Sequence, residues 1–266
     1  MMGAMSEFDD ATRVAADGSA AIAEGWDING HANGGYLLAL AANHMRALSG
    51  RSDPLTVTGH FLAPGTPGPV QIESTLVKSG RRFTTVTAQM QRDSKPILQV
   101  TGLFGDLADA SDGYVKLASG PPDLPPIDQC VPRSPTQGVV HVPINDRLKI
   151  RLRPGDESFM RGERKGVAEM AGWFAFADDR PIDTLALLLV ADAFPPAVFH
   201  IDLQPGWVPT LELTVHVRAA PAPGPVRCVF RSQFVQGGFF NEDGEVWDSA
   251  DRLVAHSRQL GLTPLT

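Results

Sequence analysis

An apolar helix pattern followed by four strand patterns occurs twice along these 266 residues, and this order constrains the fold more than any other feature. In the first half, apolar residues recur at helical spacing from Tyr36 to Leu48, with Asn33 placed to cap the helix and Gly50 to end it. Because no second helical layer is predicted, a sheet wrapped around this helix is the economical way to bury it. The four strand patterns that follow are 55–62, 70–78, 83–92 and 96–104.

The second half repeats this order around another apolar stretch at 181–194. Pro181 is expected in the first turn of this second helix, with Pro195 and Pro196 after its end. The strand patterns of this half are 147–153, 167–177, 210–218, 226–236, 239–247 and 252–262.

Two separate segments of the halves align at the same offset. LTVTGHFLAP (55–64) matches LELTVHVRAA (211–220) at an offset of 156 residues, and ILQVTGLFG (97–105) matches LVAHSRQLG (253–261) at that offset too. The agreement indicates a duplication. We therefore expect an N-terminal domain at 1–115 and a C-terminal domain at 145–266.

A proline-rich segment at 116–144 connects these two predicted domains. Its prolines stand among Gly, Ser and Asp, so we expect an extended surface linker without regular structure. Between 106 and 145 the prolines are Pro121, Pro122, Pro125, Pro126, Pro132, Pro135 and Pro143.

The composition excludes several classes of protein. A net charge of −7, from 23 basic and 30 acidic residues, argues against non-specific binding of nucleic acid. The longest apolar run in a predicted helix, 185–191, is far shorter than a membrane span. The N-terminus is acidic and unlike a secretory signal, so the cytoplasm is the expected location. Cys130 and Cys228 form no zinc-binding pattern, and no P-loop, GxGxxG, HExxH or GxSxG motif occurs.

One carboxylate stands out because it follows the apolar stretch of the second predicted helix. Asp192 is disfavoured near a helix C-terminus by roughly 0.3–1 kcal/mol, and burying it costs more unless it is hydrogen-bonded. The simpler interpretation is an exposed residue or a turn partner. The repeat also shows an asymmetry, because polar residues of the second half are aligned with chemically different residues of the first half. These pairs are Asp192 with Asn43, Thr210 with Pro54, and Gln259 with Leu103.

These residues lie within segments that resemble the TesB-like, or type II, acyl-CoA thioesterases over nearly the whole chain. The resemblance implies an α+β double hotdog: two fused hotdog domains, each a curved antiparallel sheet around a long central helix. The loop from Asp192 to Thr210 is shorter than in the bacterial prototype of the family. The matching segments are NGGYLLALA, HFLAP, LVADAFPP, TLELTVHVRA and RLVAHSRQLGL.

The resemblance also implies an activity and its residues. Asp192 corresponds to the family's catalytic aspartate, and Thr210 and Gln259 to its partners, which together hold a water near the thioester carbonyl. Gly34 and Gly35 either bind substrate, through backbone N–H groups that polarise the thioester oxygen, or form only a packing turn. The implied reaction converts acyl-CoA to free fatty acid and CoA, as in fatty acid metabolism, with no metal or cofactor. A homodimer is expected.

Two other functions remain open at this point. A non-catalytic acyl-CoA or lipid-binding protein would use the same pocket, with Asp192, Thr210 and Gln259 as structural residues. A 2-enoyl-CoA hydratase or dehydratase would need an Asp/His pair, for which His200 is the nearest histidine after Asp192. Thiol release from acyl-CoA distinguishes the thioesterase from both alternatives.

Overall fold

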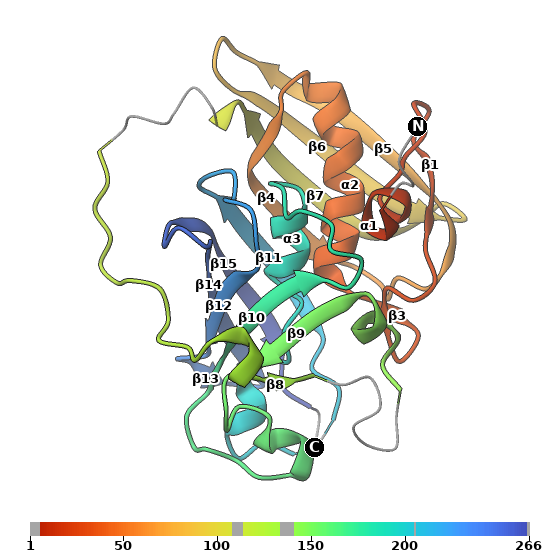
Figure 1. The fold of residues 1–266 in the computed structure, drawn as a ribbon. Helices are drawn as coiled ribbons and strands as arrows, with labels where there is room; N and C mark the ends of the chain where they lie inside the picture. Colours follow the sequence, from red (N-terminus) through yellow and green to blue (C-terminus); the bar gives the residue numbers. More distant parts are fainter. Residues whose placement is uncertain (1–5, 108–113, 134–140, 205, 265–266) are drawn as a thin grey trace.

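A thirteen-stranded antiparallel sheet runs through both halves of the chain and forms the centre of the molecule (Figure 1). The computed structural model describes residues 6–107, 114–133, 141–204 and 206–264. Its first half contains α1 (Glu7–Ala11), β1 (Ser19–Ile22), β2 (Asp27–Ile28), β3 (His31–Ala32), α2 (Gly34–Ser49), β4 (Asp53–Phe61), β5 (Gly68–Ser79), β6 (Thr84–Arg92) and β7 (Lys95–Gly105).

The second half supplies the remaining strands but less helix. It contains η2 (Ile127–Gln129), β8 (Val131–Pro132), η3 (Pro143–Asp146), β9 (Leu148–Leu152), η4 (Ser158–Arg161), β10 (Glu169–Phe176), α3 (Ala186–Val190), η5 (Ala197–His200), β11 (Thr210–Val217), β12 (Val226–Arg231), β13 (Val235–Gln236), β14 (Phe239–Trp247) and β15 (Leu253–Leu262). The order in the sheet is β1-β5-β6-β7-β4-β11-β15-β14-β12-β10-β9-β8, with β13 beside β14, while β2 and β3 form a separate pair.

Helix α2 confirms the first predicted helix and both of its ends. The Asn33 side chain accepts a hydrogen bond from the Tyr36 N–H at 2.9 Å, and Gly50 ends the helix in the left-handed region, with φ of 65°. Most of the helix is buried against β4, β5, β6 and β7 (Figure 1). The four strands predicted after this helix are present, with ends that differ by only a few residues.

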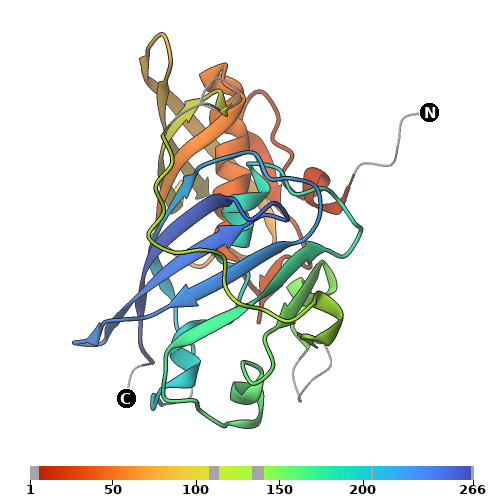
Figure 2. The same cartoon turned by 60° about the vertical axis from the view of Figure 1, so that its left-hand side comes forward.

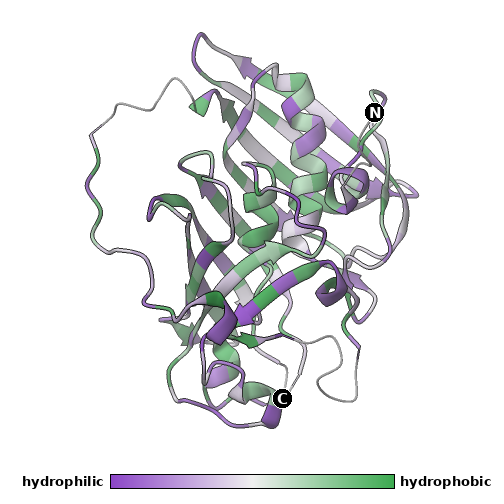
Figure 3. Cartoon of the chain, in the orientation of Figure 1, coloured by the Kyte–Doolittle hydropathy of each residue, from purple (hydrophilic) through white to green (hydrophobic). Residues whose placement is uncertain are grey.

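The second predicted helix is much shorter than expected, so the expectation of a long central helix in each half was wrong for the second half. Only Ala186–Val190 is helical, and Pro181 lies before the helix rather than in its first turn. The Asp183 carboxylate accepts from the Ala186 N–H at 2.8 Å, which holds residues 183–186 in a turn just before the helix. At the other end, the Asp192 N–H turns back to the Leu189 carbonyl at 3.0 Å and closes it early. The five residues of α3 are hydrophobic throughout (Figure 3) and fully buried.

The two halves meet through equivalent strands at the middle of the sheet. β4 and β11 pair antiparallel, and Thr58 lies opposite Thr214, its counterpart at the offset of 156 residues. Their hydroxyl groups are hydrogen-bonded at 2.9 Å. An antiparallel pair of equivalent strands in which a residue faces its own counterpart has a local two-fold axis at that residue. The offset seen in the sequence therefore corresponds to a near-symmetry of the sheet.

The predicted linker is only partly without regular structure. Residues 114–126 form no helix or strand and run outside the sheet, as Figures 1 and 2 show. The expectation was wrong beyond this point, since Val131–Pro132 pairs with β9 and η2 and η3 are short 3₁₀ helices. Residues 134–140 of the predicted linker lie outside the described residues.

A single hydrophobic cluster contains buried residues from both halves of the chain, including those of α2 and α3. These two helices pack against each other, and a cavity lies beside the start of α2 and the end of α3. No helix within the described ranges is long and apolar enough to cross a membrane.

Candidate active site

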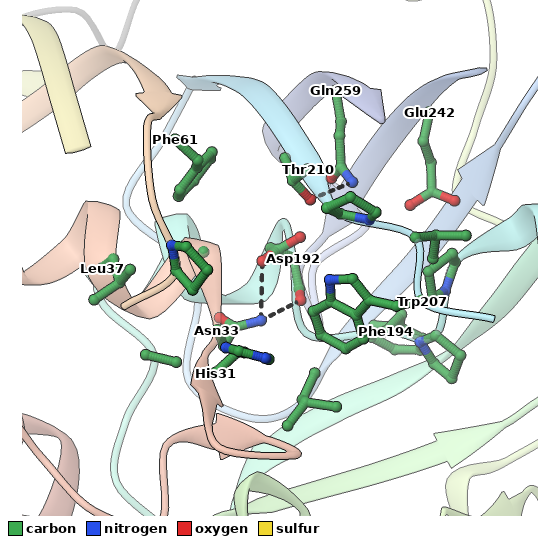
Figure 4. A pocket seen from close by; sticks show the side chains of 18 of the residues that line it. His31, Asn33, Leu37, Phe61, Asp192, Phe194, Trp207, Thr210, Glu242 and Gln259 are labelled. Carbon is green, nitrogen blue, oxygen red and sulfur yellow. Dashed lines mark hydrogen bonds between the residues drawn. The ribbon is translucent and has the colours of Figure 1, made fainter. Parts of the chain in front are cut away.

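A cavity of about 650 Å³ opens where the N-terminus of α2 approaches the end of α3 (Figure 4). Its walls are largely aromatic and aliphatic, and they include Phe61, Phe159, Phe194, Phe199 and Trp207. Four of the five residues predicted from the sequence also line it: Gly34, Asp192, Thr210 and Gln259. The site therefore combines residues of both halves.

The Asp192 carboxylate is held in place by the beginning of α2. Its Oδ2 accepts hydrogen bonds from Asn33 Nδ2 at 2.9 Å and from the Gly35 N–H at 3.0 Å. Asn33 Nδ2 also donates to the Asp192 backbone carbonyl at 2.7 Å. Burial raises the pKa of Asp192 to about 6, although the nearby backbone N–H groups of Gly35 and Gly34 and the Asn33 amide act in the opposite direction. The carboxylate is therefore desolvated and oriented, and it titrates close to neutral pH.

Gly34 and Gly35 allow the two helices to approach closely enough for these bonds. A Cβ atom at Gly35 would lie 2.5 Å from the Leu188 carbonyl oxygen, and one at Gly34 would lie 2.8 Å from the Phe61 ring. Neither position has room for a side chain. The Gly35 N–H is occupied by Asp192 in this structure, and Gly35 does not line the cavity.

Thr210 and Gln259 form a second polar group in the same cavity. Gln259 Nε2 donates to Thr210 Oγ1 at 2.8 Å, from the neighbouring strand β15. In Figure 4 this pair lies across the cavity from the Asn33–Asp192 contact. Within the described part of the chain, no hydrogen bond joins Asp192 directly to Thr210 or Gln259.

Glu242 is a cavity residue that the sequence analysis missed. It lies opposite Gln259 in the pairing of β14 with β15, and its Oε2 accepts from the Ala197 N–H at 2.5 Å. Burial, with a smaller contribution from Asp192, raises the pKa of Glu242 to about 8. The sequence did contain a signal for it, because strand residues two positions apart share a face, and Glu242 therefore lies on the same face as the buried residues Phe240 and Val246.

Arg133 and Asn33 also contribute to the cavity without having been predicted there. Arg133 follows β8 in the expected linker and donates from Nη1 to the Ala193 carbonyl at 2.9 Å. No periodicity or motif distinguished it in the sequence, where it stands between Pro132 and Ser134. Asn33 was expected only as a helix cap, a role that it combines with holding Asp192.

His200, the histidine considered for a hydratase, does not line this cavity. It is buried edge-on against Phe159, with ring centroids 5.9 Å apart. The described residues contain no group of three or more His, Cys, Asp or Glu side chains arranged to hold a metal ion.

The arrangement suits a reaction that begins with proton removal from a small polar molecule beside an apolar ligand. Oδ2 of Asp192 is occupied by Asn33 and Gly35, whereas Oδ1 accepts no hydrogen bond from the described residues. A carboxylate with a pKa of about 6 accepts a proton more readily than an ordinary one. The Gln259 carbonyl and the Thr210 hydroxyl provide further positions for hydrogen bonds.

Comparison with known proteins finds two adjacent matches to family models. Residues 121–263 match the acyl-CoA thioesterase C-terminal domain, and residues 22–105 match the acyl-CoA thioesterase N-terminal domain. An uncharacterized protein of Mycobacterium tuberculosis is 27% identical over 263 residues, which cover 91% of this chain and 89% of the relative.

Solved structures show the same likeness. A candidate thioesterase II from Thermobifida fusca YX is 30% identical, with a TM-score of 0.87 and 100% of both chains covered. A protein of unknown function with a hotdog fold from Alicyclobacillus acidocaldarius is 24% identical, with a TM-score of 0.87 over 98% of this chain and 99% of that one. The second likeness shows that the fold is of the hotdog kind.

Proposed function

Because the chain belongs to the acyl-CoA thioesterase family, we propose that it hydrolyses acyl-CoA to a free fatty acid and CoA, with a water activated by Asp192. The observation that carries this proposal is the buried Asp192 carboxylate, held by Asn33 and Gly35 in an apolar cavity that also contains Thr210 and Gln259. The apolar walls suit an acyl chain, and the polar groups suit a water beside its thioester.

In this mechanism Asp192 acts as the general base. A water lies between Asp192 Oδ1 and the Thr210–Gln259 pair, and it gives one proton to Asp192 as its oxygen attacks the thioester carbon. The Gln259 carbonyl accepts the second hydrogen of the water, and the Thr210 hydroxyl orients it. The carbon–sulfur bond then breaks, and the proton held by Asp192 passes to the departing thiolate.

Gly34 and Gly35 enter the proposal through their position at the start of α2. Their lack of a side chain lets the thioester and Asp192 share the same helix N-terminus, which favours negative charge. Donation from the Gly35 N–H to the thioester oxygen would require Asp192 to give up that hydrogen bond.

We also propose that the two halves are fused hotdogs, with an N-terminal domain at 1–115 and a C-terminal domain at 145–266, and that the later part of the connecting segment 116–144 packs on the C-terminal domain through β8. The pairing of Thr58 with Thr214 at the centre of the sheet supports this division, as does the boundary between the two family matches. The second hotdog would contain the shortened helix α3 rather than a long central one. The homodimer stays a prediction.

Replacement of Asp192 by Asn tests the proposal most directly. Asn keeps an oxygen that accepts from Asn33 and Gly35, so the packing is retained while the base is lost. We expect the rate of thiol release from acyl-CoA to fall by roughly 10²–10⁴-fold. The control is Asp202→Asn, which changes an exposed aspartate paired with Arg164 outside the cavity.

Two outcomes would contradict the proposal. Asp192→Asn that folds normally and hydrolyses acyl-CoA at the wild-type rate would remove Asp192 from the mechanism. Wild-type protein that binds acyl-CoA tightly and leaves it intact for hours would instead identify a binding protein.

A further inference from the structure

Arg133 is a cation in the cavity wall that the proposed hydrolysis does not use. It is the only Lys or Arg among the described residues that line the cavity. Its backbone is fixed beside β9, where the Arg133 N–H donates to the Ile150 carbonyl at 2.9 Å. Its Nη1 reaches across to the Ala193 carbonyl, so the guanidinium lies beside the residue that follows Asp192.

The guanidinium has no negative partner in the described part of the chain. Neither Asp192 nor Glu242, the two carboxyl groups that line the cavity, forms an ion pair with Arg133. Their hydrogen bonds go instead to groups at the start of α2 and at Ala197. The segment that follows Arg133, 134–140, contains no Asp or Glu.

An unpaired guanidinium in such a place is energetically costly. Burial lowers the pKa of Arg133 to about 10, which still leaves the group charged at neutral pH. A desolvated charge is normally compensated by an opposite charge and by several hydrogen bonds. Among the residues that the structure describes, Arg133 makes one side-chain hydrogen bond, to a backbone carbonyl, and its other N–H groups are available for a ligand.

We propose that Arg133 binds an anionic oxygen group of the substrate, so that the protein prefers a thioester carrying a carboxylate or phosphate within reach of this side chain. The inference rests on the proposed function. A planar guanidinium suits both groups because it offers two parallel N–H donors. The anion is either a carboxylate at the far end of the acyl group or a phosphate of CoA.

The test compares CoA thioesters of octanoic acid and octanedioic acid, which differ by one terminal carboxylate. Charged hydrogen bonds contribute enough for Arg133→Met to lower kcat/KM for the octanedioic thioester by roughly 10–100-fold. If the anion is this carboxylate, the octanoic thioester changes by less than about 3-fold on that same basis. Arg151→Met is the control, because Arg151 lies in the neighbouring strand, bonds to a single backbone carbonyl and does not line the cavity.

Thioesters of N-acetylcysteamine, which lack the phosphates of CoA, identify the source of the anion. If Arg133→Met lowers hydrolysis of both CoA thioesters equally but leaves the N-acetylcysteamine thioesters unchanged, the anion is a CoA phosphate. An equal loss on every thioester, with or without phosphate or carboxylate, overturns the proposal and leaves Arg133 a structural residue.

Binding of the free acids, measured by calorimetry, separates this inference from the proposed function. Octanedioic acid should bind more tightly than octanoic acid to the wild type if the anion is the acyl carboxylate, and Arg133→Met should remove the difference. This readout requires no hydrolysis. If no thioester is hydrolysed and the acids still depend on Arg133, the hydrolysis proposal fails and the anion site stands.

Discussion

Replacement of Glu242 by Gln should make the protein more stable at alkaline pH. Glu242 is buried on the inward face of β14, where burial raises its pKa to about 8 from the usual 4.5. The folded state therefore binds this proton more strongly than the unfolded state does. The stabilisation that results is complete below about pH 4.5 and is lost as the pH rises through about 8.

The magnitude follows from the interval between the two pKa values. At about 1.4 kcal/mol for each pKa unit, ionisation of Glu242 lowers the free energy of unfolding by up to about 5 kcal/mol. Gln has nearly the same shape, does not ionise and keeps an oxygen for the Ala197 N–H. Asp192 is present in both proteins, so its own titration largely cancels from the comparison.

The assay is urea unfolding between pH 5 and pH 9, followed by the fluorescence of the tryptophans. Wild type and Glu242→Gln should differ least in free energy of unfolding at pH 5, the variant should become progressively the more stable between pH 5 and pH 8, and the difference should level off above pH 8. Glu245→Gln is the matched control, because Glu245 lies on the other face of β14 and contacts Arg231 at 3.3 Å. A constant difference between wild type and Glu242→Gln at every pH would refute the reasoning.

Three further predictions follow from the site. Because Asp192 must be ionised to accept a proton and burial raises its pKa to about 6, kcat/KM should fall as the pH drops below 6, which a pH–rate profile measures. Gln259→Leu, which introduces the residue type found at the counterpart position Leu103, should lower kcat by roughly 10–100-fold in steady-state assays, since it removes one of the groups that position the water. Gly35→Ala should destabilise the fold by roughly 1–3 kcal/mol in urea, whereas Gly120→Ala, where a Cβ meets nothing within 4 Å, should not.

The sequence alone determined the elements whose signals are local. The ends of α2 follow from Asn33 and Gly50, and most strands follow from alternation between turn residues. The repeat at an offset of 156 residues anticipated the symmetric pairing of Thr58 with Thr214. Asp192 was conspicuous because a carboxylate at the end of an apolar helix is costly. The matches to both thioesterase domains confirm the family resemblance, whereas the catalytic role that the resemblance implies for Asp192 stays a prediction.

The tertiary structure decided which distant groups surround Asp192. Its contacts with Asn33 and Gly35 span more than 150 residues, and no local pattern encodes such a distance. The pKa of Glu242 is raised because the folded chain buries this carboxyl group between β14 and the start of η5. Arg133 lies in a segment that the sequence predicted to be a surface linker. In the structure, the pairing of β8 with β9 places this segment beside the sheet. The periodicity of a sequence indicates which face of a helix or strand is buried. The desolvation of a charged side chain on that face, and the partner of its charge, depend on which distant residues pack against it in the tertiary structure.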